Sequence, residues 1–370
     1  MLKKICFIII VLLIAINIAW AISSSYTAIA EVVDVKNQVL DGAVSCQLIK
    51  AKVLIGPYKD KMVDLEYHRV EYTSHSYYIK KGNKVLVNVF LEEGALKGSL
   101  INIWRVDFLK ELCIIFLILL IIFGRLKGIC SLISLIFSGY IIIKLLIPLV
   151  LKGYNAVLVS IMCSSIIIIV SFILIAGFTK KSLVAILGTV GGTFTAGALS
   201  QIYTNLCSIT GLADEDVSIL ISSIGLDIDF RGLYMSAVII GTIGVIMDVS
   251  MSITSVIFEI KSKSPSISRF ELMQSGLKVG KDVMSTMVNT LVLAYVGSFM
   301  PLLIIYITSE TSFLQAVNTE TLAVEIIRSL CGSIGLIVTI PLTCFFATYL
   351  IQDTKYKNRR FKKYKRYNSK

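Results

Sequence analysis

The chain has 370 residues, of which 56% are hydrophobic and 16% are charged, and its mean hydropathy is +0.82. Soluble domains carry about 25% charged residues, so this composition excludes an ordinary soluble protein. The net charge of +12 does not indicate nucleic-acid binding, because nine basic residues fall in the last sixteen positions and most others lie in short loops or the N-terminal polar region. The apolar residues come in blocks of about 20, which predicts a multi-pass α-helical membrane protein.

The first predicted element is a transmembrane helix over residues 1–22. Lys3 and Lys4 precede an uninterrupted apolar run, as in a signal anchor. A cleaved signal peptide is the alternative, because Ala19-Trp20-Ala21 has the small-x-small pattern of a cleavage site. Both readings place the segment that follows outside the cell.

Residues 23–107 form the only sizeable polar region, which we expect to be a small exterior β domain. Alternating runs predict five strands, at about 44–56, 61–72, 75–79, 84–91 and 99–106. Gly56-Pro57 and Lys81-Gly82-Asn83 mark turns between them. Five short strands suit a small β-barrel of the OB or SH3 kind, compact over 31–107. Its lone cysteine, Cys46, predicts that the domain has no disulfide.

Residues 108–352 are expected to form a seven-helix transmembrane core, which makes about eight transmembrane helices in all. The apolar blocks lie at about 109–123, 129–151, 154–176, 183–207, 233–258, 284–307 and 325–351. With the N-terminus inside, the basic loop residues fall on one side and the acidic loops at about 214–216, 227–229, 310 and 320 fall on the other. This positive-inside pattern predicts that both termini are cytoplasmic.

Two cytoplasmic segments are predicted outside the apolar blocks. Segment 259–283 contains an amphipathic stretch, 267–282, that begins with a capping-box spacing at Ser268 and Glu271; we expect a linker helix at the membrane interface. The basic tail, 353–370, carries nine basic residues interleaved with aromatic ones. Binding of anionic lipid and a solvated topology signal are the two readings of this tail.

The stretch 241–259 carries the candidate ion or proton site. Gly241, Gly244, Asp248, Ser252 and Ser255 recur every three or four residues, so they share one helix face. An ionised carboxylate at the centre of a spanning helix costs roughly 2.5–3.5 kcal/mol, so Asp248 is expected to face the protein interior or a wet cavity. Asn289, at comparable depth on the next helix, completes a candidate site of Asp248, Asn289 and Ser252. A structural polar contact is the alternative.

Other polar and small residues of the late helices are given lesser roles. Glu325 and Arg328 lie three apart near the outer end of the last helix, as a structural ion pair or a gate. Close helix packing is expected at seven glycines: Gly188, Gly191, Gly192, Gly241, Gly244, Gly332 and Gly335. The sequence offers no catalytic motif and no metal-ligand spacing, so neither an enzyme nor a bound cofactor is expected.

Three late blocks resemble the YibE/F family of bacterial membrane proteins: GTIGVIMDVSMSIT (241–254), GKDVMSTMVNTLVLAYVG (280–297) and EIIRSLCGSIGLIVTIPLT (325–343). LGTVGGTFTAGALS (187–200) and the turn at Ile55-Gly56-Pro57-Tyr58 fit as well. The resemblance implies a multi-pass protein of the bacterial plasma membrane, without an activity that can be carried over.

A weaker resemblance, to SecD/SecF and RND-type transporters, lies in the order of elements. One helix precedes an exterior domain, and a later helix carries an intramembrane Asp, here Asp248, before an IFE run at 257–259. An amphipathic segment and two further helices follow. The chain departs from the SecD pattern by one extra core helix and a small exterior domain. The likeness implies ion-coupled transport.

Two functions are therefore expected. The first is a transporter or energised transport subunit that uses the Asp248 carboxylate for ion or proton coupling. The second is a non-transporting assembly or signalling protein that displays the β domain outside. The expected partners are the lipid bilayer, anionic lipid at the basic tail, and a second membrane subunit of the same family or a second copy, with no nucleic acid.

Overall fold

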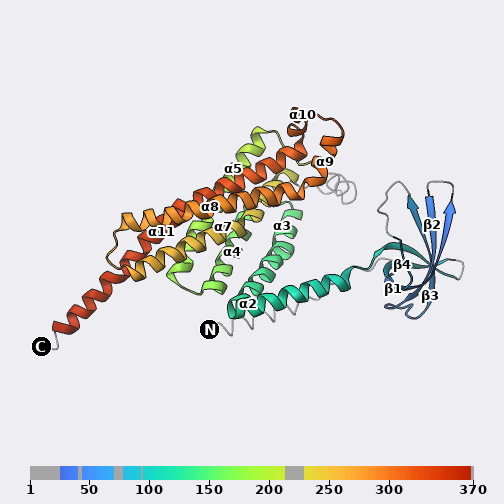
Figure 1. The fold of residues 1–370 in the computed structure, drawn as a ribbon, viewed down its shortest axis with the longest axis horizontal. Helices are drawn as coiled ribbons and strands as arrows, with labels where there is room; N and C mark the ends of the chain where they lie inside the picture. Colours follow the sequence, from blue (N-terminus) through green and yellow to red (C-terminus); the bar gives the residue numbers. More distant parts are fainter. Residues whose placement is uncertain (1–25, 41–43, 71–77, 93–94, 213–228, 368–370) are drawn as a thin grey trace. The chain divides into compact units, whose positions relative to one another are not determined.

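The computed structural model describes residues 26–40, 44–70, 78–92, 95–212 and 229–367 (Figure 1). Most of these residues are helical, and a five-stranded barrel lies near the N-terminus. The chain divides into two compact units, Met1–Ile118 and Leu119–Lys370. The helix expected at 1–22 lies outside the described residues.

The N-terminal unit contains a closed barrel with the strand order β1-β2-β3-β5-β4. Its strands are β1 (Tyr26–Leu40), β2 (Val44–Val53), β3 (Met62–Val70), β4 (Lys84–Glu92) and β5 (Ala95–Ile103). All neighbours pair antiparallel except β3 and β5, which are parallel. This is the OB order rather than the SH3 order, and the predicted small barrel is confirmed.

The barrel interior is filled by alternating apolar residues of every strand. Ala30, Ala51, Val53, Val85 and Val87 are fully buried. Gln47 is a buried polar side chain in this interior; its amide donates to the Asn37 Oδ1 at 2.8 Å, and its carbonyl oxygen accepts from the Ile79 backbone N–H at 3.1 Å. The barrel therefore satisfies this buried amide within itself.

The strands differ from the prediction at β1, at the expected strand 75–79 and at the last strand, which was expected at 99–106 and lies at Ala95–Ile103. The long strand β1, Tyr26–Leu40, was missed, because a bulge between Val32 and Asp34 interrupts the alternation on which the prediction rests. Most of the strand expected at 75–79 lies outside the described residues, and Ile79 itself is buried in the barrel core without belonging to a strand.

The long helix α2 (Val106–Ile141), the first in the described part of the chain, spans the boundary between the two units and continues through the π-helical turn η1 (Ile142–Leu146) into α3 (Ile147–Leu151). At Arg125 the backbone leaves the helical region, with φ 47° and ψ −131°. The chain folds back there, since a side chain at Gly128 would collide with the Leu120 carbonyl. The predicted apolar blocks 109–123 and 129–151 are therefore separated at this break.

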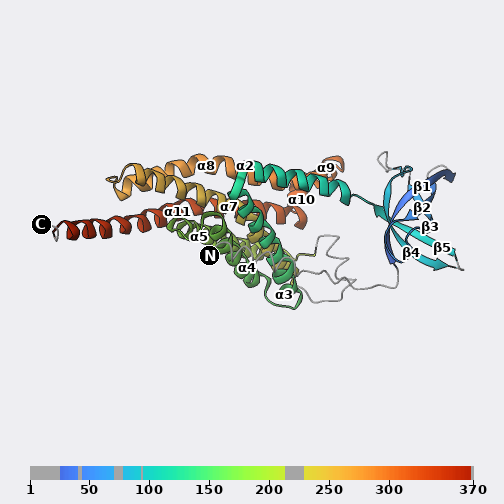
Figure 2. The same ribbon diagram turned by 90° about the horizontal axis from the view of Figure 1, so that it is seen from below.

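The remaining helices form a bundle in which long helices lie side by side (Figures 1 and 2). They are α4 (Ala156–Ala176), α5 (Lys180–Leu206), α7 (Phe230–Lys263), α8 (Arg269–Ser298), α9 (Met300–Thr308), α10 (Phe313–Val317) and α11 (Glu320–Tyr367). Side-chain caps start several of them: Asn155 accepts from the Leu158 N–H, and Asp229 accepts from the Gly232 N–H.

The segment expected as an interfacial linker, 267–282, belongs instead to the bundle. The capping box at Ser268 and Glu271 is present, but it starts α8, which continues without a break to Ser298. Leu272 is fully buried, and Gly276 packs against Ile257 of α7 and Cys344 of α11. Part of its apolar side therefore packs on other helices of the chain, while Phe270 remains exposed.

Four helices are long and apolar enough to cross a membrane in the described part of the chain: α4, α5, α7 and residues Glu320–Ile351 of α11. A fifth span results if α8 and α9 count as one, although they meet at an angle of 61°. Pro301, at the start of α9, cannot donate a helical hydrogen bond and explains this bend in the predicted helix 284–307. The eight predicted spans are therefore not confirmed.

Candidate functional site

Helix α7 has two unlike faces. Ile246, Val249 and Ile253 are fully buried in a core that α5, α8 and α11 also build. Gly241, Gly244, Asp248 and Ser252, four of the residues predicted to share a face, are all exposed. The helical spacing therefore groups these residues as expected, but the face they form points away from the bundle core.

Asp248 is thus exposed rather than enclosed. Among the described residues, its carboxylate has no hydrogen bond and no ion pair. Asp248 was expected to face the protein interior or a wet cavity; the structure places it outside the core of the described bundle, because the β-branched side chains on the opposite face of α7 fill that core. An unpartnered carboxylate on a membrane-length helix is costly in lipid, and the described residues supply no partner for it.

Asn289 lies on α8 at the level of Asp248. The two helices run antiparallel: Gly241 faces the Tyr295 hydroxyl, and Gly280 faces Ile253. Asp248 lies between these two contacts, level with 285–289. Asn289 is exposed, and no hydrogen bond joins it to Asp248 in the described structure.

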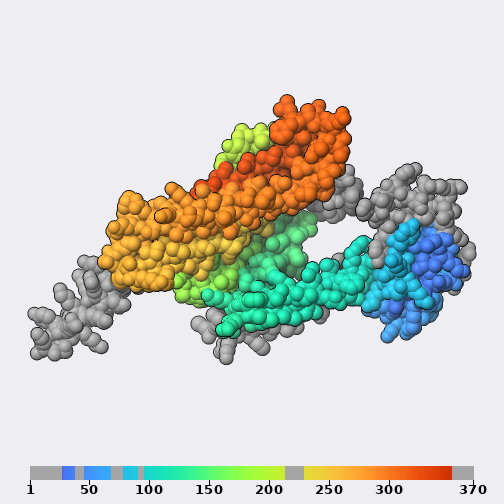
Figure 3. Space-filling view, in the orientation of Figure 1, coloured from blue at the N-terminus to red at the C-terminus, as the bar shows by residue number. Residues whose placement is uncertain are grey.

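Polar residues of α8 extend this surface. Ser285, Thr286 and Thr290 are exposed, and their hydroxyls donate to backbone carbonyls of their own helix. In the space-filling view α8 and the adjacent part of α7 form one continuous surface (Figure 3). We call this the outer polar face; it consists of Gly241, Gly244, Asp248, Ser252, Ser285, Thr286, Asn289 and Thr290.

The seven predicted packing glycines fall into two groups. Gly192 of α5 and Gly335 of α11 lie at a close crossing, where a side chain on either would collide with backbone of the other helix. The structure places three more at similar approaches: Gly188, Gly191 and Gly332. Gly241 meets the Tyr295 hydroxyl, whereas Gly244 has open space around it and packs against no other helix of the described chain.

Glu325 and Arg328 form an ion pair near the start of α11. The distance between the Arg328 Nη1 and the Glu325 Oε1 is 2.6 Å, and the side chains are 19% and 8% exposed. The Glu325 Oε2 and the Arg328 Nε are buried without a hydrogen-bond partner in the described structure. The pair is therefore largely buried, and part of its hydrogen-bonding capacity is unused within the described structure.

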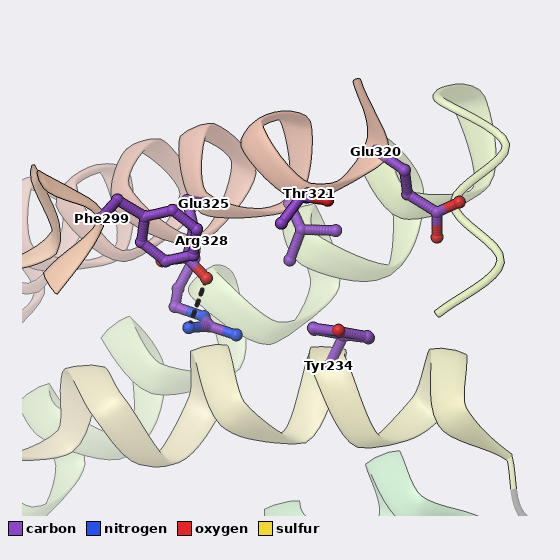
Figure 4. Close-up of a pocket in the computed structure, with 7 residues that line it drawn as sticks. Tyr234, Phe299, Glu320, Thr321, Glu325 and Arg328 are labelled. Carbon is purple, nitrogen blue, oxygen red and sulfur yellow. Dashed lines mark ion pairs between the residues drawn. The ribbon is translucent and has the colours of Figure 1, made fainter. Parts of the chain in front are cut away.

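A cavity of about 230 Å³ lies beside this ion pair. Its lining comes from α7, the α8–α9 bend and one face of α11: Tyr234, Phe299, Glu320, Thr321, Val324, Glu325 and Arg328. Figure 4 shows the Tyr234 ring rising from α7 toward α11, with Phe299 beside the Glu325–Arg328 pair. The cavity thus combines aromatic rings with three charged side chains.

Glu320 is a functional candidate that the sequence reasoning treated only as an acidic loop residue. Its Oε1 accepts hydrogen bonds from the backbone N–H of Thr210 at 2.7 Å and of Gly211 at 2.6 Å, and its Oε2 accepts from the Thr210 hydroxyl at 2.9 Å. This carboxylate ties the start of α11 to the end of the α5 segment. Its position in the first turn of a helix was the available signal.

The described residues contain no group of three or more His, Cys, Asp or Glu side chains arranged to hold a metal ion. Asp248 and the Glu325–Arg328 pair belong to different places, since the outer polar face does not include the cavity lining. The structure therefore offers two separate candidate sites: the exposed Asp248 carboxylate on α7, and a partly open cavity with charged side chains at the start of α11.

Comparison with known proteins bears on the helical part. No curated protein and no solved structure matches the chain. The family profile described as YibE/F-like protein matches residues 112–353, which cover most of helix α2 and all later membrane-length helices of the described chain. The match includes Asp248, Asn289, Glu325 and Arg328. The chain therefore belongs to the YibE/F-like family of membrane proteins.

Proposed function

We propose that the chain is one subunit of an ion-coupled membrane transport complex, in which a second copy covers the outer polar face and Asp248 takes part in coupling. The observation that carries the proposal is the exposed, unpartnered carboxylate of Asp248 on a helix of membrane length. Facing lipid, an ionised side chain costs roughly 2.5–3.5 kcal/mol. A protein partner removes this cost by supplying hydrogen-bond donors.

A second copy has the right chemistry for this role. The outer polar face presents an acceptor, Asp248, on α7 and a donor, the Asn289 amide, on α8 at the same level. In a two-fold dimer the same patch meets itself, so Asp248 of one copy faces the α8 residues of the other. Exposed Gly241 and Gly244 allow the helices of two copies to approach closely.

A titratable carboxylate at such an interface can bind and release a proton or a small cation as the two copies move. The β-branched and apolar residues behind Asp248 are packed, so the movement has to occur at the uncovered side. The alternative function is a non-transporting assembly or signalling protein. It would use the same interface, and Asp248 would only hold the two copies together. The same exposed carboxylate supports both, and one experiment separates them.

The experiment compares Asp248→Asn with Glu259→Gln in a deletion strain that has been profiled for sensitivity to ions and toxic compounds. Asn keeps the size and hydrogen-bonding capacity of Asp but cannot titrate. Glu259 lies further along the same face of α7 and is paired with Lys263 at the surface, so its variant is the matched control. Native mass spectrometry of membranes reports the oligomeric state of each variant.

Loss of complementation by Asp248→Asn, with the dimer retained, is the expected result. Loss of both complementation and dimer would favour the assembly function. If the complex contains a different member of the family, then that protein, and not a second copy, covers the outer polar face. Full activity of Asp248→Asn would show that coupling does not use this carboxylate.

A further inference from the structure

The cavity at the start of α11 has a chemistry of its own. We propose that it binds a small organic ammonium ion. This inference goes beyond the transport proposal and does not depend on Asp248, because the cavity and the outer polar face have no residue in common. It rests on the charge, the aromatic lining and the size of the cavity.

The charges of the lining favour a cation. The described lining contains two carboxylates, Glu320 and Glu325, and one guanidinium, Arg328. Arg328 and Glu325 neutralise each other at 2.6 Å. Glu320 keeps its charge and receives only neutral donors, the N–H groups of Thr210 and Gly211 and the Thr210 hydroxyl. The Glu320 carboxylate turns toward Thr210 and Gly211, so the lining carries one net negative charge beside the cavity rather than at its centre (Figure 4).

The aromatic residues favour an organic cation over a metal ion. Tyr234 reaches the cavity from α7, and Phe299 reaches it from the bend between α8 and α9 (Figure 4). Ring faces attract ammonium groups that carry carbon substituents, because such groups lose little hydration when they leave water. Glu320 and Glu325 are five residues apart on α11, so their backbones are separated by roughly 7.5 Å along the axis and do not form a compact metal site.

The size of the cavity limits the ligand to a small molecule. Its volume of about 230 Å³ lies below the roughly 300–1,000 Å³ typical of pockets for drug-sized ligands. Methylammonium, tetramethylammonium and choline suit this space. Val324 and Thr321 complete the wall, with apolar contact for the methyl groups and a hydroxyl beside them.

Direct binding to the full chain in lipid nanodiscs tests the proposal. Radiolabelled choline is the first probe, and methylammonium and tetramethylammonium compete with it at concentrations up to the millimolar range. The carbon isostere of choline, in which a tert-butyl group replaces the trimethylammonium group, has the same shape without the charge. Saturable choline binding that the isostere does not displace is the expected result.

Two pairs of variants locate the site. Phe299→Leu keeps the apolar volume but removes a ring, and we expect about threefold to tenfold weaker choline binding. Phe313→Leu, at an exposed ring of α10, is its control and is expected to have no effect. Glu320→Gln removes the excess charge and should weaken binding by about tenfold or more. Thr210→Val disturbs the same hydrogen bonds without changing the charge, so it should weaken binding less.

Three results would overturn the proposal. The first is no saturable binding of any of the three ammonium probes. The second is equal binding of choline and its neutral isostere, which would make the cavity an apolar pocket only. The third is choline binding that persists unchanged in both Phe299→Leu and Glu320→Gln, which would place the site elsewhere on the chain.

Discussion

The barrel and the helical bundle differ in how far their polar groups are hydrogen-bonded. In the barrel, buried Gln47 has partners on Asn37 and Ile79, and the strands close on themselves without a free edge. In the bundle, the hydroxyls of Ser160, Thr189 and Thr254 are buried without a partner in the described structure, and Asp248 is exposed without one. The barrel is complete as a single chain, whereas the bundle retains polar capacity for water, ions or another chain.

Within the bundle the same contrast holds between two acidic residues. Glu325 is buried but has its counter-charge three residues away on the same helix, and Asp248 is uncovered and has none. A buried charge with its partner makes the fold depend on both members of the pair. The fold of the single chain does not depend on an exposed charge in this way. Removing the partner of Glu325 should therefore lower the stability of the chain, whereas neutralising Asp248 should not.

The largest expected effect comes from breaking the buried pair. Arg328→Gln leaves the Glu325 carboxylate buried and uncompensated, and should lower the free energy of unfolding by about 3–5 kcal/mol. The double variant Glu325→Gln/Arg328→Gln removes both charges and should recover most of this loss. Asp248→Asn, by contrast, should leave stability unchanged or slightly raised.

Denaturant-induced unfolding in mixed micelles measures all three variants against the native chain. A single Arg328→Gln variant as stable as the native protein would show that Glu325 is not held as a charge in the folded state. A destabilised Asp248→Asn variant would mean that this carboxylate already has a partner within the chain.

The sequence predicts the barrel, the late helices and the grouping of polar residues on one face of α7, but not the side to which that face points. Apolar blocks and alternating runs indicate the barrel and the late helices, and helical spacing places Gly241, Gly244, Asp248 and Ser252 on one face. Spacing does not say whether that face points inward, because the opposite face of α7 is also apolar and its branched side chains fill the core. The sequence also does not reveal that residues of the amphipathic stretch 267–282, such as Leu272, pack against other helices of the chain.

The cavity is still harder to foresee. Its lining joins α7, the α8–α9 bend and the first turns of α11, which lie far apart in the sequence. The spacing of Glu325 and Arg328 indicates an ion pair, but nothing local to Tyr234, Phe299 or Glu320 indicates a common site. Only the tertiary packing of three helices brings these residues together.

The next largest effect tests the two groups of glycines. A side chain at Gly192 would collide with the Thr339 hydroxyl and lie 2.8 Å from the Gly335 carbonyl oxygen. Gly192→Ala should therefore lower the free energy of unfolding by about 2–3 kcal/mol. Gly244→Ala is the matched control; it has open space and should be neutral or slightly stabilising for the single chain, since alanine favours a helix.

The oligomeric state adds a second measurement for the same pair. If a second copy covers the outer polar face, Gly244→Ala should weaken the dimer while Gly192→Ala mainly destabilises the chain. Equal stability losses for the two variants would contradict the distinction between an inner and an outer set of glycines.

A smaller effect is expected at the buried amide of the barrel. Gln47→Leu leaves the buried Ile79 N–H without an acceptor and should lower barrel stability by about 1–2 kcal/mol. Lys50→Gln, an exposed change on the same strand, is its control. Hydrogen-exchange mass spectrometry of the full chain measures β2 directly, and unchanged protection of that strand in Gln47→Leu would show that the barrel does not depend on this amide.

The smallest effect concerns the surface ion pair of the barrel, in which the Lys52 Nζ lies 2.8 Å from the Asp60 Oδ1. The hydrogen bond and charge of Lys52 lower the pKa of Asp60, and those of Asp60 raise the pKa of Lys52. A carboxylate with a lowered pKa adds stability above its unfolded value of about 3.9 and loses it as the pH falls through the folded pKa. Because both groups are exposed, the contribution is small at neutral pH.

Asp60→Asn isolates this pair with little backbone strain, because Asp60 has a φ of 66° and asparagine tolerates that left-handed conformation. Above about pH 5 the variant barrel should exchange its amides slightly faster than the native barrel. The difference should begin to shrink as the pH falls below about 4 and should vanish once the pH has passed through the lowered pKa of folded Asp60, where the native carboxylate is protonated too. Asp64→Asn, at an exposed carboxylate of β3 outside the pair, should show neither effect. A difference between Asp60→Asn and native protein that stays constant with pH would show that the Asn acts through the turn conformation and not through the charge. The barrel would then have no pH-dependent element at this position.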